Sequence, residues 1–397
     1  MENKNMVIKR DLQLELKKLA KDYPVITVIG PRQSGKTTLV KQVFPSKPYV
    51  NLETADVRTL ALKDPHGFFS EYPDGCILDE IQKAPQLLSY IQELVDQSAQ
   101  DIKGQFILTG SHQLELHQAI TQSLAGRTAL LVLMPFNISE LQSGGIDLSL
   151  DEYLLQGFYP RVYKDNLNAT TYYRNYVQTY LERDVRQLIN VKDLNIFQRF
   201  LKLCVGRIGQ VMNIHTLSND VGVSAPTIKQ WLSVLKASFV IFELPPYFEN
   251  FGKRVIKSSK IYFADVGLAT YLLDIENIIQ LKRDPLRGFL VENLVILELL
   301  KARMNSGLEP HLYYYRDSHN HEVDVIFKNA DQLVPIEIKA AATFHQDFLK
   351  GLDFFGDLVK TRCHKKFLIY SGKQEQKIGT TKIFNYKNAT KLLKEVV

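Results

Sequence analysis

The sequence predicts an α/β protein whose N-terminal part is built around a parallel β-sheet. Short apolar segments alternate with longer amphipathic ones from residue 24 to residue 133, and a glycine-containing loop follows the first apolar segment. Strands that alternate with helices form a parallel sheet covered on both faces. With 397 residues, of which 45% are hydrophobic, the chain is long enough for more than one core.

The N-terminal elements are expected in a regular order. A helix at 11–20 follows a polar lead-in, and the turn Pro73–Gly75 precedes the third strand. We expect strands at 24–29, 49–52, 76–78, 105–108 and 128–133, and helical segments at 36–44, 86–98 and 120–124.

The pattern then changes twice. Residues 151–209 are predicted to be helical, and Tyr172, Tyr176 and Tyr180 recur every four residues on one helical face, which we interpret as core. A helix-turn-helix pattern followed by two strands occupies 213–265. After Pro285 we expect helices at 286–303 and 346–357, and strands at 312–316, 322–328, 334–339 and 366–370.

Charge, cysteine content and the distribution of apolar residues limit which partners and which cellular compartment we expect. The net charge of +6 is compatible with an anionic partner and equally with an ordinary solvated surface. Cys76, Cys204 and Cys363 are far apart in the sequence, which fits a reducing compartment. Residues 1–10 lack the apolar core of a signal peptide, and no apolar run approaches the ~18 residues of a membrane span. We therefore expect a cytoplasmic protein with no membrane partner.

Residues 30–37 read Gly-Pro-Arg-Gln-Ser-Gly-Lys-Thr, a GxxxxGK[ST] phosphate-binding loop, between a predicted strand and a predicted helix. Backbone N–H groups of such a loop bind phosphates, aided by the positive N-terminus of the helix. Lys36 brings a charge to the outer phosphates, and the Thr37 hydroxyl is a magnesium ligand. The predicted nucleotide-binding residues are Gly30, Pro31, Arg32, Gln33, Ser34, Gly35, Lys36, Thr37 and Thr38.

An apolar strand that ends in two carboxylates complements this loop. Asp79 is placed to hold magnesium, directly or through water, and Glu80 to orient or deprotonate the attacking water. Lys36, Asp79 and Glu80 together predict magnesium-dependent hydrolysis of ATP.

Two further positions carry open alternatives. Thr109 and Ser111 end the next strand, where either hydroxyl could sense the terminal phosphate, whereas Ser111 could instead cap a helix. Arg127, just before the last strand, could be an arginine finger in cis or across a subunit interface, or part of a structural salt bridge.

Segments 30–37, 77–80, 108–111 and 123–127 together resemble the AAA+ ATPases of bacteria and archaea. The particular family that they resemble has a C-terminal domain of unknown function, and the similarity continues through residues 180–185, Tyr-Leu-Glu-Arg-Asp-Val. The resemblance implies an ATPase core with an AAA+ or RecA-like parallel sheet, a helical segment, a winged helix and a nuclease-like end. It supplies no substrate.

The helix-turn-helix pattern is the winged-helix candidate. Helices at 215–221 and 225–237 are joined by a turn, with Ser224 as an N-cap. DNA-binding proteins of this kind place the early residues of the second helix against base edges, whereas other winged helices serve as joints between domains or subunits. The candidate DNA-contacting residues are Thr227, Lys229 and Gln230 on the helix, and Lys253, Arg254 and Lys257 on the wing.

The C-terminal part contains carboxylates in a recognisable order. Glu292 lies on a predicted helix, Asp324 on a strand, and Glu337 and Lys339 on one face of the next strand. This order resembles the PD-(D/E)XK nuclease superfamily, with Val323 where the motif name has proline. The resemblance implies that Glu292, Asp324 and Glu337 hold magnesium, and that Asp324, Glu337 and Lys339 are catalytic.

Two functions remain open from the sequence. In the first, ATP hydrolysis gates a C-terminal part that binds and cleaves DNA; in the second, the winged helix and nuclease-like part bind protein partners in an ATP-driven scaffold. A homo-oligomer is compatible with both. The predicted domains are an ATPase core at 1–150, a helical linker or lid at 151–210, a winged helix at 211–270 and a nuclease-like domain at 271–397.

Overall fold

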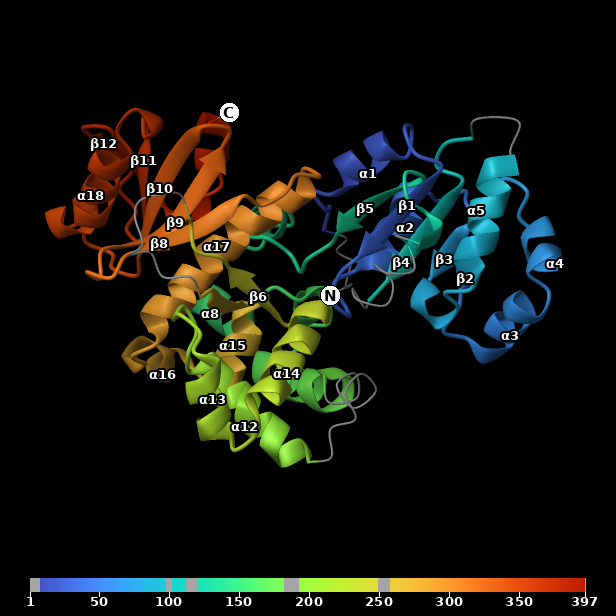
Figure 1. Cartoon of the computed structure of the whole chain (residues 1–397), viewed down its shortest axis with the longest axis horizontal. Helices are drawn as coiled ribbons and strands as arrows, with labels where there is room; N and C mark the ends of the chain where they lie inside the picture. The colour runs from blue at the N-terminus through green and yellow to red at the C-terminus, as the bar shows by residue number, and fades with distance from the viewer. Residues whose placement is uncertain are drawn as a thin grey trace. The chain divides into compact units, whose positions relative to one another are not determined.

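The computed structural model describes residues 8–97, 102–111, 120, 122–181, 193–248 and 258–396. The chain forms two compact units, each described separately below (Figure 1). The first unit ends at Phe136, earlier than the predicted boundary at 150, and includes the short segments Ala237–Phe239 and Arg303–Leu308. Most residues of the three predicted C-terminal domains fall within the second unit.

The first unit contains a five-stranded sheet with the order β2-β3-β4-β1-β5, in which all strands are parallel, as predicted. Its strands are β1 (Val25–Ile29), β2 (Tyr49–Asn51), β3 (Ile77–Asp79), β4 (Phe106–Gly110) and β5 (Thr128–Val132). Its helices are α1 (Gln13–Leu19), α2 (Lys36–Val43), α3 (Ala55–Lys63), α4 (Pro65–Ser70), the 3₁₀ turn η1 (Ile81–Lys83) and α5 (Leu87–Gln97).

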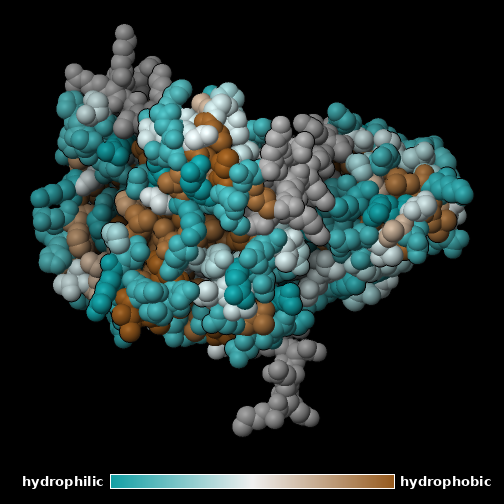
Figure 2. Space-filling model, turned by 90° about the horizontal axis from the view of Figure 1, so that it is seen from below, coloured by the Kyte–Doolittle hydropathy of each residue, from teal (hydrophilic) through white to brown (hydrophobic). Residues whose placement is uncertain are grey.

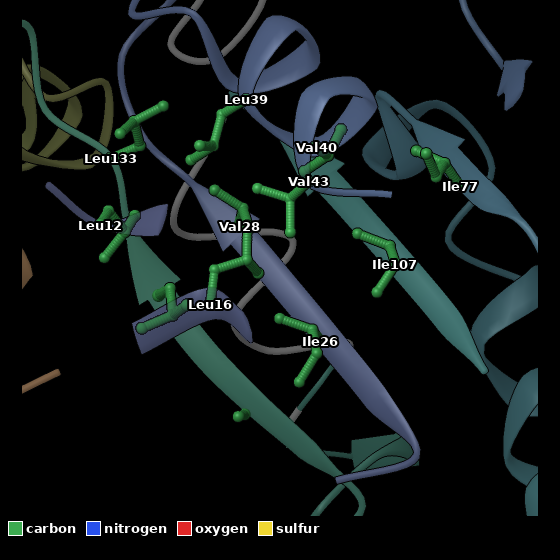
Figure 3. Packing of buried hydrophobic residues seen from close by; sticks show 12 residues of the cluster. Leu12, Leu16, Ile26, Val28, Leu39, Val40, Val43, Ile77, Ile107 and Leu133 are labelled. Carbon is green, nitrogen blue, oxygen red and sulfur yellow. The ribbon is translucent and has the colours of Figure 1, made fainter. Parts of the chain in front are cut away.

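Helices α1 and α2 cover one face of this sheet. Figure 3 shows apolar side chains of both helices packed against those of β1 and its neighbours. Because strand residues alternate between faces, Phe106 points to the opposite face from Ile107. There the ring of Phe106 meets that of Phe69 on α4 at 5.6 Å. The sheet is thus buried on both sides, which explains why β1 and β4 are apolar almost without alternation.

The second unit begins with short helices whose start signals are explicit in the sequence. Asn137 and Glu140 form one capping box, and Ser149 and Glu152 form another. These helices are α7 (Ile138–Ser143), α8 (Leu150–Gln156), α9 (Pro160–Lys164), α10 (Ala169–Tyr176) and the π-helical turn η2 (Val177–Leu181).

A helical group with a two-stranded sheet follows in the second unit. Val211 makes an isolated antiparallel bridge to Lys260, so a short extended segment lies beside β7 on the side opposite β6. The elements are α12 (Leu194–Val205), α13 (Ile214–Val221), α14 (Ala225–Ala237), β6 (Ile241–Leu244), β7 (Lys260–Phe263), α15 (Val266–Leu272) and α16 (Ile278–Arg283).

The C-terminal part of the second unit is a mixed six-stranded sheet with the order β12-β13-β11-β10-β9-β8 (Figure 1). Helix α17 is buried all round from Leu290 to Lys301, whereas α18 buries only one side against the sheet. The elements are α17 (Arg287–Asn305), β8 (Leu312–Arg316), β9 (Glu322–Asn329), β10 (Gln332–Lys339), η3 (Gln346–Leu349), α18 (Lys350–Val359), η4 (Lys360–Arg362), β11 (Lys366–Tyr370), β12 (Gln376–Ile378), β13 (Thr381–Asn385), η5 (Tyr386–Asn388) and α19 (Lys391–Val396).

Several local predictions need adjustment. The helix predicted at 346–357 is a 3₁₀ turn followed by α18. The strand predicted at 239–244 begins only at Ile241, because Phe239 has φ 55°. The tyrosine stripe is confirmed: Tyr172 and Tyr176 are buried, and consecutive rings lie 6.1 and 5.8 Å apart up to Tyr180. The predicted wing residues Lys253, Arg254 and Lys257, and the linker residues Arg183 and Asp184, lie outside the described residues.

On the face shown in Figure 2, hydrophilic residues predominate, and hydrophobic ones show in groups between them. Within the described part of the chain, no helix combines the length and apolar composition that a membrane span requires.

Candidate functional site

The phosphate-binding loop lies at the carboxyl end of β1, between this strand and α2. Its backbone requires glycine at two places. Gly30 has φ 151°, and a Cβ there would lie 2.2 Å from the carbonyl oxygen of Leu133. Gly35 has φ 95° and precedes α2 without a side-chain cap. The first N–H groups of α2 are therefore left for another acceptor, the role that a phosphate fills at such a terminus.

Lys36 is buried inside this loop. Its Nζ donates to the backbone oxygens of Gly30 at 3.0 Å and Pro31 at 2.9 Å. Burial lowers the pKa of Lys36 to about 8, although the carboxylates of Glu80 and Asp79 act in the opposite direction. The ammonium is thus held in the loop by weak carbonyl acceptors, which the stronger negative charge of phosphate oxygens can replace.

Asp79, at the end of β3, is surrounded by hydroxyl donors. Thr37 Oγ1 donates to its two carboxylate oxygens at 3.1 and 2.9 Å, and the Tyr49 hydroxyl donates at 2.7 Å. Thr109 Oγ1 is a third donor. Burial and the contact with Asp79 raise the pKa of Tyr49, which stays a neutral donor. A carboxylate and a hydroxyl oxygen are the hard ligands that magnesium prefers, so Thr37 and Asp79 fit the predicted metal site.

Glu80 follows Asp79 in a left-handed conformation with φ 58°, which turns its side chain away from the strand. Its N–H donates to Thr109 Oγ1 at 3.3 Å. Its carboxylate accepts from Ser111 Oγ at 3.1 Å and from the Gln82 amide. Ser111 therefore orients Glu80, a role that the sequence did not suggest. The two roles considered for Ser111, phosphate sensing and helix capping, stay predictions.

Arg127 lies at the other end of the sheet from the loop. Its backbone oxygen accepts from Val25 N at the start of β1, whereas the loop follows the end of that strand. Five residues of strand separate the two, about 16 Å at ~3.3 Å per residue. The Arg127 guanidinium forms a two-pronged ion pair with Asp96 at 2.6 and 2.7 Å. The salt-bridge alternative matches this geometry, and a finger acting in cis does not.

The sequence interpretation missed Arg10, Tyr49 and Gln82 in this site. Arg10 is buried, and it donates to the backbone oxygens of Ser34 at 2.7 Å and Met134 at 2.6 Å. It thereby fixes the phosphate-binding loop to the segment after β5. No local motif marks Arg10, whereas the position of Tyr49 at the start of β2 and of Gln82 two residues after Glu80 could have suggested proximity.

The second cluster lies in the mixed sheet of the second unit. Strands β9 and β10 form an antiparallel hairpin that brings Asp324 beside Glu337: Asp324 Oδ2 accepts from Ile338 N at 2.8 Å. Lys339 Nζ contacts Glu337 Oε1 at 2.5 Å. Burial and the charge of Asp324 raise the pKa of Glu337. Its Oε2 is buried without a hydrogen-bond partner in the described structure.

Glu292, on α17, is engaged by residues that the sequence interpretation did not place here. Its Oε1 accepts from the Tyr262 hydroxyl and lies 3.1 Å from Lys260 Nζ. Lys260 also pairs with Glu322 Oε1 at 2.6 Å. Burial raises the pKa of Glu292, although the charge of Lys260 opposes this effect.

The prediction of a three-carboxylate magnesium set needs correction. Among the described residues, no group of three or more histidine, cysteine, aspartate or glutamate side chains is arranged to hold a metal ion. Glu292, Asp324 and Glu337 lie in one region, but Glu292 faces Lys260 and Tyr262, while Glu337 faces Lys339. These residues therefore do not fit a preformed metal centre.

Helix α14 presents part of the predicted DNA-contacting surface. Lys229 and Gln230 are exposed, whereas Ile228 and Trp231 are buried against the neighbouring helices. Thr227 is half-buried, and its hydroxyl is hydrogen-bonded to Ser224 at 2.8 Å. Lys229 and Gln230 are thus available for contacts outside the chain.

Comparison with known proteins divides the chain into three segments. Residues 22–142 match a family model described as an AAA domain. Residues 147–278 match a domain of unknown function, DUF8612, and residues 287–389 match another, DUF4143. Uncharacterized proteins of Mycobacterium tuberculosis and Mycobacterium bovis are each 29% identical to this chain over 342 residues, which are 85% of this chain and 75% of the relative.

Solved structures give weaker similarity. A Walker-type ATPase of Pyrococcus abyssi aligns with 67% of this chain and 96% of its own, at 17% identity and a TM-score of 0.47. Thermotoga maritima RuvB aligns with 60% of this chain and 89% of its own, at 15% identity and a TM-score of 0.29. The family match and the loop geometry agree on one part of the molecule: residues 22–142 form an AAA-like ATPase domain of the P-loop type.

Proposed function

We propose that the first unit hydrolyses ATP with magnesium and that this turnover drives a nucleic-acid-binding second unit. One observation carries the first half of the proposal. Lys36, Thr37, Asp79 and Glu80 come from two different strand ends, and hydrogen bonds and charge link them at a single edge of the sheet. Lys36 neutralises the outer phosphates, and the N-terminus of α2 orients them.

Glu80 is placed to act on the attacking water. Ser111 and Gln82 hold its carboxylate, and the left-handed backbone directs it away from β3. A carboxylate held in this way orients a water and accepts its proton. Magnesium, when bound, neutralises charge on the phosphates. Thr37 and Asp79 would hold it.

Steady-state turnover tests this half. Purified full-length protein should release phosphate from ATP in the presence of magnesium, and Lys36→Ala should abolish the release. Lys17→Ala, at an exposed lysine of α1, serves as the matched control and should leave turnover unchanged. Turnover that persists in Lys36→Ala would show that the nucleotide site lies elsewhere.

The nucleic-acid half is supported by the second unit. Its element order is one helix, an extended bridge at Val211, two helices and two antiparallel strands, and this order is the one expected of a winged helix. Lys229 and Gln230 are exposed on α14, where a recognition helix presents base-contacting residues. Equilibrium binding to single-stranded, duplex and branched DNA tests this half. Lys229→Ala should weaken binding at low salt, and no binding to any form would exclude a DNA partner.

The scaffold alternative also has an observation in its favour. The lysines beside Glu292 and Glu337 occupy carboxylate oxygens that a cleaving site would offer to magnesium. Cleavage assays with Asp324→Ala and Lys339→Ala separate the two functions. Magnesium-dependent cutting that both variants abolish would establish a nuclease, whereas DNA binding without cutting would favour a binding module.

A further inference from the structure

Lys260 is an unusual residue for its position. It is the first residue of β7, only 1% of its surface is exposed, and its backbone pairs with Leu244 in β6 and bridges Val211. Strand residues alternate between faces, so Lys260 and Tyr262 point the same way. Both reach the carboxylate of Glu292 on α17. A buried lysine is costly unless it is paired, which indicates that its partners hold it here.

Lys260 pairs with Glu292 and Glu322, and Asp324 and Glu337 interact electrostatically with Glu292. We call these four residues the carboxylate cluster. Lys260 Nζ lies 3.1 Å from Glu292 Oε1 and 2.6 Å from Glu322 Oε1. Two ion pairs at a buried position thus place the Lys260 ammonium among carboxylates.

Protein cations compensate most of the charge of the carboxylate cluster. Lys260 forms ion pairs with Glu292 and Glu322, and Lys339 forms one with Glu337 at 2.5 Å. Arg316 lies 3.5 Å from Glu322. With every group ionised, four negative charges face three positive ones. The affinity of a carboxylate cluster for a divalent cation rises with the negative charge that the protein leaves uncompensated. Here the cation would also be repelled by the Lys260 ammonium.

We propose that Lys260 is a built-in cation that takes the place of a divalent metal ion in the carboxylate cluster and keeps the cluster metal-free. The inference concerns the same carboxylates as the proposed nuclease-like site, but it requires neither DNA binding nor ATP hydrolysis. Glu292 is then a structural partner of β7, and the cluster ties α17 to β7 and β9. Removal of the Lys260 charge exposes Glu292, Glu322 and Asp324 to an ion from solution.

Isothermal titration calorimetry of the nucleotide-free full-length protein with Mn²⁺ tests this proposal. Each titration is compared with that of the same protein carrying Asp324→Asn. The Mn²⁺ binding lost on this substitution is assigned to the carboxylate cluster, because an ion bound in the first unit would be present in both proteins. Wild-type protein should show no such binding up to millimolar Mn²⁺. Lys260→Met, which removes the charge at similar volume, should gain such binding, with a dissociation constant at least about tenfold below the millimolar limit of the wild-type titration. Lys377→Met, at an exposed lysine on β12, is the matched control and should gain nothing.

Two results would overturn the proposal. One is sub-millimolar, Asp324-dependent Mn²⁺ binding by the wild type; the other is a folded Lys260→Met protein that binds Mn²⁺ no better than the wild type. If Lys260→Met does not fold, the wild-type and Asp324→Asn titrations still decide between a metal-free and a metal-binding cluster. Loss of DNA binding or of ATP turnover leaves these titrations unaffected, so failure of the proposed function is separately visible.

Discussion

Replacing Lys36 by methionine should abolish ATP turnover and at the same time stabilise the nucleotide-free protein. Burial lowers the pKa of Lys36 from 10.5 to about 8, which corresponds to about 3 kcal/mol of unfavourable free energy for the charged form in the folded state. The ammonium recovers part of this through hydrogen bonds to Gly30 and Pro31, at about 1 kcal/mol each. Methionine fills similar space without the charge, so the net gain should be about 1 kcal/mol.

The gain should depend on pH in a defined direction. At pH 7 Lys36 is charged in both the folded and the unfolded chain, so its full cost is present. Between pH 8 and pH 10.5 the folded protein loses the proton first, and the cost disappears. The stability of the wild type should therefore rise relative to that of Lys36→Met as the pH rises through this window.

Differential scanning calorimetry measures both effects. At pH 7, Lys36→Met should raise the melting temperature of the first unit by about 2–4 °C, whereas Lys17→Met should not change it. Magnesium and ATP should raise the melting temperature of the wild type but not that of Lys36→Met. A Lys36→Met protein that melts below the wild type without nucleotide, or that still responds to ATP, would refute the reasoning.

Three further predictions address other parts of the molecule. Glu80→Gln should retain ATP in filter-binding assays but lose turnover by about 100-fold or more, and near-normal turnover would remove Glu80 from the mechanism. Arg127→Ala should leave the turnover of dilute protein unchanged, because Arg127 lies at the far end of β1 from the loop; a loss seen only at high protein concentration would instead support a finger acting between subunits. Asp265→Ala should destabilise the second unit by about 2–4 kcal/mol, since it removes the cap of α15 and leaves the Phe158 N–H and the Tyr173 hydroxyl without their acceptor. Urea unfolding followed by the fluorescence of Trp231, the one tryptophan in the sequence, reports this unit, and an unchanged midpoint would contradict the assignment.

The elements that the sequence predicted well are those whose local signals and tertiary environment agree. The helix at Ala225–Ala237 and the strands at Leu312–Arg316 and Lys366–Tyr370 have the predicted bounds. The terminal strands β12 and β13 were not predicted, because β12 is short and polar and depends on its neighbour for hydrogen bonds. Helix α15 was missed because it is buried nearly all round and shows no amphipathic period.

The residues of the candidate sites also differ in how far the sequence could predict them. Lys36, Thr37, Asp79 and Glu80 belong to motifs with fixed local spacing, so their convergence could be predicted from strand order alone. Lys260 could not be predicted, because its partners Glu292 and Glu322 lie 32 and 62 residues further along the chain, and nothing local in β7 marks it as more than a strand residue. Long-range ion pairs of this kind follow from tertiary packing, which composition and periodicity do not encode.

The hydroxyls around Asp79 have a consequence for the order in which ligands arrive. A free magnesium ion must compete with Thr37, Tyr49 and Thr109 for the same carboxylate. An ion carried on ATP would meet a different situation, because the phosphates would offer Lys36 an acceptor in place of the loop carbonyls, and Thr37 and Asp79 would hold the metal. Occupancy of the metal position should then follow the concentration of the nucleotide complex rather than that of free magnesium.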